Sequence, residues 1–547
     1  MKTYKNIYFD GKNHRYAIFL DAELELNFCY WHEFKRHGVR YIETDTYFKS
    51  RMSNRKVFPH SRGKCVDEIE MNVKDHEIKS DVICDMTIEN EVLREKLLSK
   101  DAAPLVFIRC KFGDVEFEKL KVERSVAMID CVFEGNFRFI DCIIKGSLWL
   151  SNSRFCKHFS LKSSLVYGDV HCESVDFSGM GGASFRGLKA DNLYLDLGVK
   201  GSDDLIWLNE MCIDDAVSLG GTFHSEVQIL GRQDMDEDPE NVSSIGTIVI
   251  GKELYEFENA NVTQINKKLR IEDILLKSEL LIENIEVELI AVKGIQTSAI
   301  RMSNVSVVKD VVIDSCRSVY NEFDIMLVNS SVGRHCKIDK NEIAGVISLE
   351  GSAVSEVLYF EDNCLDEASK LNLKRFTASR LLIHPVEVLY QGAKSHLFKP
   401  KQFGLLKETS RRELADQYCA LKHWLGDAGK LKHEDEAFFH MRHYYHDNLF
   451  LRAIFGVIFG WGVRLSNIAL SSIVIILLFA ALYYYFDSST ASISLAMSTQ
   501  SFISSFFGVW GDYSPDGLIA NLVFLESLTG VIFITVFVGA YIRKLLR

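Results

Sequence analysis

Three units of eleven residues follow one another in this chain: Asp130-Cys-Val-Phe-Glu-Gly-Asn-Phe-Arg-Phe-Ile140, Asp141-Cys-Ile-Ile-Lys-Gly-Ser-Leu-Trp-Leu-Ser151 and Asn152-Ser-Arg-Phe-Cys-Lys-His-Phe-Ser-Leu-Lys162. Within each unit the apolar residues alternate at a spacing of two, which is the periodicity of a β-strand. Short strands that return at a fixed register stack as a solenoid, because each unit buries its apolar face only against its neighbours. The repeat therefore predicts a β-helix.

The alignment of these units has columns of similar residues, and it extends beyond them. Strand-like alternation returns in residues 271–282 and 307–313, so we predict the solenoid over residues 101–390. Residues 1–100 lack the repeat and are predicted to form a mixed N-terminal cap over its open end. The apolar columns are Phe133, Ile144, Phe155, Val166 and Phe177, then Phe137, Leu148, Phe159 and Val170, then Phe139, Leu150 and Leu161, and a turn-like glycine column is Gly135, Gly146, Gly168 and Gly179.

Two segments near the C-terminus have the length and composition of membrane spans. Residues 466–486 form a stretch of 21 residues without a charge, and residues 518–542 form one of 25 with Glu526 as its one charged residue. Roughly 20 apolar residues cross a bilayer as a helix, and lipid leaves the backbone groups no other partner. We therefore predict two transmembrane helices in an all-α module over residues 465–547.

The flanking charges predict how these helices are oriented. No Lys or Arg occurs from Leu465 to Ile542, whereas Arg464 and Arg543 stand directly outside. The positive-inside rule then places both termini in the cytoplasm, in a multi-pass protein of the inner (plasma) membrane whose large N-terminal part is cytosolic. The tyrosines 483–485 close the first helix, where amphipathic rings prefer the headgroup level.

Composition limits the remaining function classes. The chain of 547 residues has a net charge of −12 and 13 cysteines. This charge argues against nucleic acid as a partner, because no basic stripe is available to neutralise phosphates. An odd number of cysteines without paired spacing suits a reducing compartment better than a disulfide framework. No paired carboxylates, activated nucleophile or cofactor motif has a persuasive spacing, so we expect neither an enzyme nor a cofactor.

Between the solenoid and the spans the apolar period becomes helical. Residues 408–424 and 430–445 predict a two-helix hairpin within a linker at residues 400–447. Residues 448–464 are apolar and aromatic but are interrupted by glycines. They predict an interfacial segment that lies on the cytoplasmic leaflet and is anchored by Trp461.

Four groups of residues permit a ligand site, and we favour a plainer interpretation of each. The acidic stretch 234–241 lacks EF-hand spacing and fits a solvated loop better than a Ca²⁺ site. The glycine-rich stretch 179–187 lacks the Lys-Ser/Thr of a phosphate loop and fits a turn. Glu436, His440 and His443 share one helix face, which favours an interface over a metal site or pH switch. The zinc candidates are Cys29, His32, His37, His60 and Cys65. They contain no second cleanly spaced pair of ligands, which favours scattered structural residues over a zinc site.

Motifs in the C-terminal part suggest a known combination of domains. They are Tyr418-Cys-Ala-Leu-Lys-His-Trp-Leu-Gly-Asp-Ala-Gly429, Glu436-Ala-Phe-Phe439 and Gly460-Trp-Gly-Val-Arg464, followed by two helices around a loop. This arrangement resembles bacterial proteins that join a pentapeptide-repeat, right-handed β-helix to a two-transmembrane potassium-channel-like pore module. The resemblance is close over residues 405–547, whereas in the solenoid only the architecture is similar. It implies a homotetramer, because the family closes its pore with four copies.

The segment between the two spans resembles the pore loop of that family, at residues 492–516. Residues 492–506 would be its re-entrant pore helix, and Gly511-Asp-Tyr-Ser-Pro515 matches the Gly-Asp-x-x-Pro ending of potassium-channel filters. Where the family has Thr-Val-Gly-Tyr-Gly-Asp, this chain has Phe507-Gly-Val-Trp-Gly-Asp512, which leaves the selectivity open. Acidic rings at Asp512 and Asp516 predict conduction of monovalent cations, with K⁺ slightly preferred. The implied filter and pore-loop residues are Ser504, Phe507, Gly508, Val509, Trp510, Gly511 and Asp512.

The second span resembles the inner helix of the family. Glu526 matches its start and is predicted to lie behind the filter with hydrogen-bond partners, because an unpaired carboxylate in a membrane costs a few kcal/mol. Gly530 or Gly539 would supply a bend. Four residues on one face are predicted to form the cytoplasmic constriction, namely Gly530, Ile534, Phe537 and Tyr541.

Two functional hypotheses from different classes follow. The first is a cation channel that is gated or assembled by the cytosolic β-helix, which would bind an unknown ligand or protein. The alternative is a membrane-anchored β-helix scaffold with a non-conducting pore module, since Phe506 and Phe507 could pack the altered filter shut. A measurement of ion flux distinguishes the two.

Overall fold

The computed structural model describes residues 6–10, 15–19, 81–99, 105–177, 181–202, 205–231, 243–251, 263–319, 322–367, 369–390, 401–406, 410–487, 490–507 and 517–546. The chain divides into two compact units. The first contains residues 1–366 and 376–379, and the second contains residues 367–375 and 380–547.

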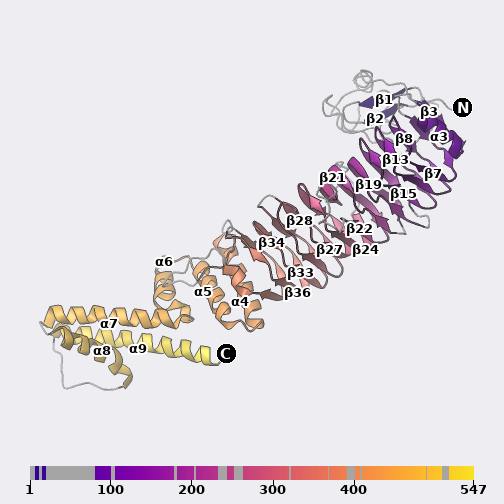
Figure 1. The fold of residues 1–547 in the computed structure, drawn as a ribbon. Coiled ribbons are helices and arrows are strands. Elements are labelled where there is room, and N and C mark those ends of the chain that lie inside the picture. Colours follow the sequence, from indigo (N-terminus) through magenta and orange to yellow (C-terminus); the bar gives the residue numbers. More distant parts are fainter. Residues whose placement is uncertain are drawn as a thin grey trace, which may run out of the picture. The chain divides into compact units, whose positions relative to one another are not determined.

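Parallel strands form a β-solenoid of about 12 turns over residues 87–384 (Figure 1). Phe137 of β11 (Phe137–Ile140) pairs with Phe159 of β15 (Phe159–Lys162), which lies 22 positions later in the chain. One coil therefore contains two of the eleven-residue units. The predicted β-solenoid is confirmed, and its coil is twice as long as the sequence repeat.

The regular coils alternate strands of four residues with strands of two residues. Each strand pairs with its equivalents in the coils before and after it, so the backbone hydrogen bonds run along the solenoid. Bounds in this part are β5 (Leu105–Ile108), β6 (Lys111–Phe112), β7 (Val115–Glu118), β8 (Lys121–Val122), β9 (Val126–Ile129), β10 (Val132–Phe133), β11, β12 (Ile143–Ile144), β13 (Leu148–Ser151), β14 (Arg154–Phe155), β15, β16 (Leu165–Val166) and β17 (Val170–Val175). Longer strands follow, among them β19 (Lys189–Ser202), β21 (Cys212–Phe223), β24 (Thr263–Glu272), β27 (Ile285–Lys293), β36 (Ala353–Glu361) and β39 (Thr377–His384).

The solenoid begins before the predicted boundary at residue 101. Strand β3 (Asp81–Cys84) pairs in parallel with β5, and β4 (Thr87–Ile88) pairs with β6. Helix α3 (Asn90–Leu98) follows β4, and the Arg124 guanidinium donates to the Lys96 carbonyl of this helix at 2.6 Å. The periodicity of the sequence does not reveal this first coil, because α3 interrupts it.

The first apolar column of the alignment divides into two stacks. Phe133 lies beside Phe155, with ring centroids 4.5 Å apart, whereas Ile144 lies beside Val166 on a different pair of strands. Equivalent residues of neighbouring units therefore occupy different walls of the coil. The aromatic stack continues from Phe133 to Phe112 at 4.7 Å, and such offset pairs add to the burial of the rings.

Left-handed backbone recurs every eleven residues, at residues other than glycine. Asp and Asn tolerate this conformation better than most side chains do. Five of these positions are followed by a residue with a buried thiol or hydroxyl, namely Cys110, Cys131, Cys142, Ser153 and Ser164. Ser153 Oγ accepts from the Cys131 amide at 3.1 Å and lies 3.1 Å from the Met128 carbonyl. The left-handed positions in the regular part, with φ between 47° and 54°, are Arg109, Lys119, Asp130, Asp141, Asn152, Ser163 and Ser174.

The described glycines of the column, Gly135, Gly146 and Gly168, serve a different purpose, namely the close approach of neighbouring coils, whereas Gly179 lies outside the described residues. A Cβ at Gly135 would lie 2.4 Å from the Asp114 backbone nitrogen and 2.6 Å from its Cα. Gly113 occupies the same position one coil earlier, and a Cβ there would meet no atom within 4 Å. Gly135 is therefore required by contact between coils, not by its backbone angles.

The second unit contains the predicted hairpin, the interfacial segment and both spans. The residues 452–458 are π-helical and 460–462 form a 3₁₀ turn in which Trp461 has a φ of 51°. Lys374 and the cap residue Ser410 lower the pKa of Glu413, at the start of the first hairpin helix, to about 2. The helices are α4 (Arg411–Asp427), α5 (Leu431–Tyr445), α6 (Leu449–Leu451), α7 (Leu465–Asp487), α8 (Ala491–Phe507) and α9 (Gly517–Leu545).

We expect Gly135→Ala to destabilise the solenoid by about 1–3 kcal/mol, because backbone atoms of the neighbouring coil would have to move. Gly113→Ala is the matched control and is expected to change stability little. The measurement is the urea midpoint of unfolding of the full-length protein in detergent, with unfolding monitored by the β-strand signal in circular dichroism. Equal shifts in the two variants would contradict the contact between coils.

Candidate functional site

The helices α7 and α9 are long and apolar enough to cross a membrane. Their mean hydropathy reaches 2.4 and 2.2, and most of each apolar window faces outward. Ile473, Leu477 and Phe524, for example, are each more than half exposed. A contiguous apolar surface of this kind needs lipid or another chain to cover it. It indicates that the protein associates with a membrane.

The shorter helix α8 packs against both α7 and α9 (Figure 1). It covers the predicted pore helix at residues 492–506 and extends it by one residue at each end. Phe502 of α8 shares an apolar cluster with Ile468 of α7 and Phe533 of α9. The three helices therefore form one bundle, with α8 held by apolar contacts to both partners.

Glu526 of α9 lies fully buried where the three helices meet. The Tyr483 hydroxyl of α7 donates to its carboxylate at 2.6 Å, and the Ser498 hydroxyl of α8 donates to the other carboxylate oxygen. The hydrogen bonding predicted for Glu526 is confirmed. One carboxylate thus connects side chains from all three helices.

Sequence reasoning missed Tyr483 and Ser498. Tyr483 was predicted to lie at the headgroup level with its two neighbours, but its side chain is fully buried, whereas Tyr484 and Tyr485 are 57% and 77% exposed. The ring of Tyr483 therefore packs inside the bundle with its hydroxyl on Glu526, and the headgroup level of the three tyrosines stays a prediction. The available signal was the carboxylate itself, since a charged residue in a span requires a partner from a facing helix.

Gly530 lies where α9 crosses α8. A Cβ at this position would lie 2.1 Å from the Phe502 carbonyl oxygen, whereas a Cβ at Gly539 would meet nothing within 4 Å. Helix α9 is continuous through both glycines, so a bend at either one stays a prediction. In this structure Gly530 allows α8 to pack closely against α9.

The remaining predicted pore residues have different surroundings. Ile534 packs at the edge of the apolar cluster, whereas Phe537 and Tyr541 are exposed on α9. Ser504 is buried, and its hydroxyl donates to the Ser501 carbonyl at 3.1 Å. Their roles in a constriction and a filter stay predictions. Phe507 ends α8, and the predicted filter residues Gly508, Val509, Trp510, Gly511 and Asp512 lie outside the described residues, as does Asp516.

The three residues Glu436, His440 and His443 do not converge on one point. The Tyr390 hydroxyl donates to Glu436, and burial together with this bond raises the pKa of Tyr390. His440 is buried and stacks on Tyr418 with centroids 5.1 Å apart. Among the described residues, no cluster of three or more His, Cys, Asp or Glu side chains has the arrangement of a metal site. The face packs the hairpin, as the plainer interpretation predicts.

The other candidate ligand stretches are only partly described. Residues 181–187 form turns around β18 (Ala183–Ser184) inside the solenoid, which agrees with a glycine-rich turn. The zinc candidates Cys29, His32, His37, His60 and Cys65 lie outside the described residues, as do residues 234–241.

No family model, curated protein or solved structure matches this chain. The resemblance to pentapeptide-repeat and potassium-channel-like proteins therefore depends on the motifs alone. The structure independently establishes the β-solenoid and the two membrane-capable helices.

We expect Gly530→Ala to lower the thermal unfolding temperature of the detergent-solubilised protein, because the new methyl group would meet a backbone carbonyl of α8. Gly539→Ala, on the same helix, is the matched control and should leave it nearly unchanged. A larger effect at Gly539 would show that close packing of α8 is not the constraint.

We expect Tyr483→Phe to cost about 1–3 kcal/mol, because it leaves a buried carboxylate with one donor fewer. Tyr484→Phe removes the same hydroxyl from an exposed neighbour and should cost little. Thermal unfolding in detergent, monitored by tryptophan fluorescence, compares the two variants. Similar stabilities would mean that the Tyr483 bond to Glu526 contributes nothing.

Proposed function

We propose that this protein is a cation-conducting channel with a potassium-channel-like pore, formed by four copies of residues 465–547 in the plasma membrane. The observation that carries the proposal is the position of α8. A short apolar helix is inserted between two bilayer-length helices and buries Phe502 against both. A re-entrant pore helix would have such contacts, because the bilayer tolerates it only where protein buries it.

The contacts along α8 support a re-entrant path. Going toward its C-terminal end, Ser498 meets Glu526, and then Phe502 meets Gly530 and Phe533. Helices α8 and α9 therefore run side by side in the same chain direction, and the C-terminal end of α8 lies away from the start of α9 at Gly517. In the sequence, residues 508–516, which contain the predicted filter, lie between the end of α8 and the start of α9.

The outer face of α8 supports assembly into a homotetramer. Leu495 and Ile503 are exposed there, and a shallow hollow of about 660 Å³ runs along the helix beside Ser492 and Thr499. A single bundle cannot enclose a pore, and neighbouring copies would cover this face. Four copies would also bring the predicted acidic residues Asp512 and Asp516 into rings that attract monovalent cations.

The charges at the ends of α7 and α9 support cytoplasmic termini. Arg464 precedes α7, and Arg543 and Lys544 lie in the last turn of α9. Lys544 and residues 464–466 line one cavity, so these cations lie at the same end of the bundle. The positive-inside rule places that end in the cytoplasm, together with the β-solenoid, whose ligand or protein partner would act on the pore.

Ion flux into liposomes tests the proposal. We expect the purified full-length protein to carry K⁺ and Na⁺, with K⁺ slightly preferred, and to exclude Cl⁻. Gly511→Asp in the predicted filter should abolish the flux, because a side chain there would obstruct the carbonyl-lined path.

Gly113→Asp is the matched control, because it makes the same substitution in the solenoid, where the new Cβ would meet nothing within 4 Å and the backbone is not left-handed. It should conduct as the wild type does. Wild-type flux no greater than that of empty liposomes, or flux unchanged by Gly511→Asp, would favour the membrane-anchored scaffold.

A further inference from the structure

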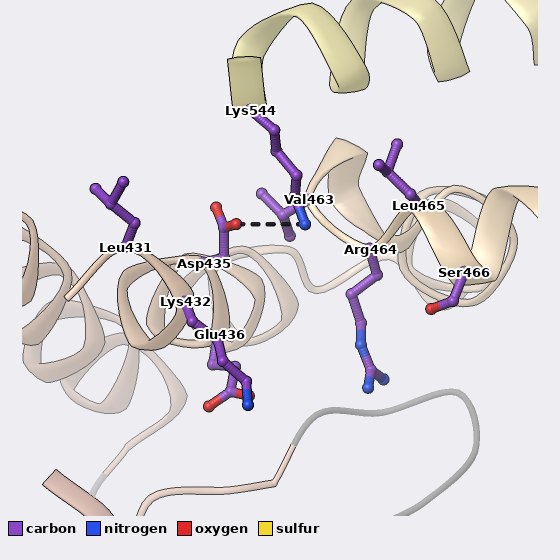
Figure 2. A pocket seen from close by; sticks show the side chains of 9 residues that line it. All are labelled: Leu431, Lys432, Asp435, Glu436, Val463, Arg464, Leu465, Ser466 and Lys544. Atoms are coloured by element: carbon purple, nitrogen blue, oxygen red, sulfur yellow. Dashed lines mark ion pairs between the residues drawn. The ribbon is translucent and has the colours of Figure 1, made fainter. Parts of the chain in front are cut away.

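A cavity of about 440 Å³ lies among helix α5, the start of α7 and the end of α9. Figure 2 shows Lys432 and Asp435 on α5, Arg464 just before α7 and Lys544 on α9 directed around it. Apolar side chains, including Val463, form part of its wall. The cavity thus combines several cations with an apolar lining.

Two of these cations have no carboxylate partner among the described residues. Lys544 forms an ion pair with Asp435 at 3.7 Å (Figure 2), and Glu436 accepts a hydrogen bond from Tyr390. Lys432 and Arg464 form no such pair in the described part of the chain. They are therefore the groups available to an anion.

Arg464 is the more informative of the two. Its Nη1 atom is buried and has no hydrogen-bond partner. Burial lowers the pKa of its guanidinium, although Glu436 opposes this effect. Nη1 itself is closed to solvent, so an anion in the cavity would meet the other atoms of the half-buried guanidinium and stabilise its charge.

The position of the cavity indicates where that anion comes from. Arg464 immediately precedes α7, and Lys544 lies in the last turn of α9. Both apolar helices therefore end at the level of the cavity, which is the headgroup level if they span the bilayer. Basic pockets at the cytoplasmic ends of membrane helices are a recognised setting for anionic lipid headgroups.

We propose that this cavity binds the phosphate group of an anionic phospholipid, with Arg464 and Lys432 as its two cations. The accessible part of the guanidinium would donate to phosphate oxygens, and apolar residues such as Val463 and Leu465 would contact the adjoining acyl chain. The inference depends on membrane insertion of α7 and α9, which belongs to the proposed function. It does not depend on ion conduction.

Native mass spectrometry of the full-length protein with added phosphatidylglycerol tests this site. We expect bound phosphatidylglycerol to be retained where phosphatidylcholine is not, and Arg464→Gln to weaken it about tenfold. Lys432→Gln changes an exposed residue, so it tests the site without disturbing the fold, and it should weaken binding in the same direction. Arg464→Lys keeps the charge and should retain part of the affinity.

Lys430→Gln is the matched control, because it removes an equal charge near the start of α5 but lies outside the cavity. It should bind phosphatidylglycerol as the wild type does. Equal lipid binding by wild type, Arg464→Gln and Lys432→Gln, or equal retention of phosphatidylcholine, would overturn the proposal.

A competition arm with inorganic phosphate identifies the source of the anion. Loss of bound phosphatidylglycerol on adding phosphate would assign the cavity to a soluble phosphate and overturn the lipid assignment. Unchanged lipid binding would support it. Because binding is measured without flux, a non-conducting protein that still binds phosphatidylglycerol would contradict the channel and leave the lipid site standing.

Discussion

A polar group shielded from water needs a hydrogen-bond partner, and this requirement organises both units of the protein. In the solenoid, the Ser153 hydroxyl occupies the core and bonds to the backbone of neighbouring coils. In the helical unit, the Glu526 carboxylate obtains its donors from Tyr483 and Ser498 and thereby joins three helices. Arg464 Nη1 is one of several buried polar atoms that have no hydrogen-bond partner among the described residues.

Close backbone contact is the second feature that the two units share. Gly135 lets one coil approach the next, and Gly530 lets α9 approach the carbonyl of Phe502 in α8. Neither position requires a left-handed backbone. In the membrane module this contact has a functional consequence, because it places α8 deep beside α9 and so determines where the predicted pore loop begins. A small residue is thus as important to the proposed pore as the polar groups are.

Helix α5 and the end of α9 are in physical contact. Asp435 pairs with Lys544 at 3.7 Å, and the Arg543 guanidinium lies 4.7 Å from the centre of the Phe438 ring. A cation over an aromatic face and an ion pair are both modest interactions, so they can be rearranged without unfolding either helix. If the pore opens at the cytoplasmic end of α9, these contacts connect the opening to the hairpin. The proposed phospholipid would bind in the same place and stabilise the same junction.

The sequence by itself determined the element types, because strand alternation and a run of apolar residues are local properties of the chain. The eleven-residue repeat predicted the solenoid, and the two long apolar stretches predicted α7 to within one residue and α9 to within three. Only the tertiary structure decided that a coil contains two repeats, that Tyr483 turns inward to Glu526, and that Gly530 packs against α8. Each of these depends on residues far apart in the chain, and a local pattern carries no information about which distant groups will meet.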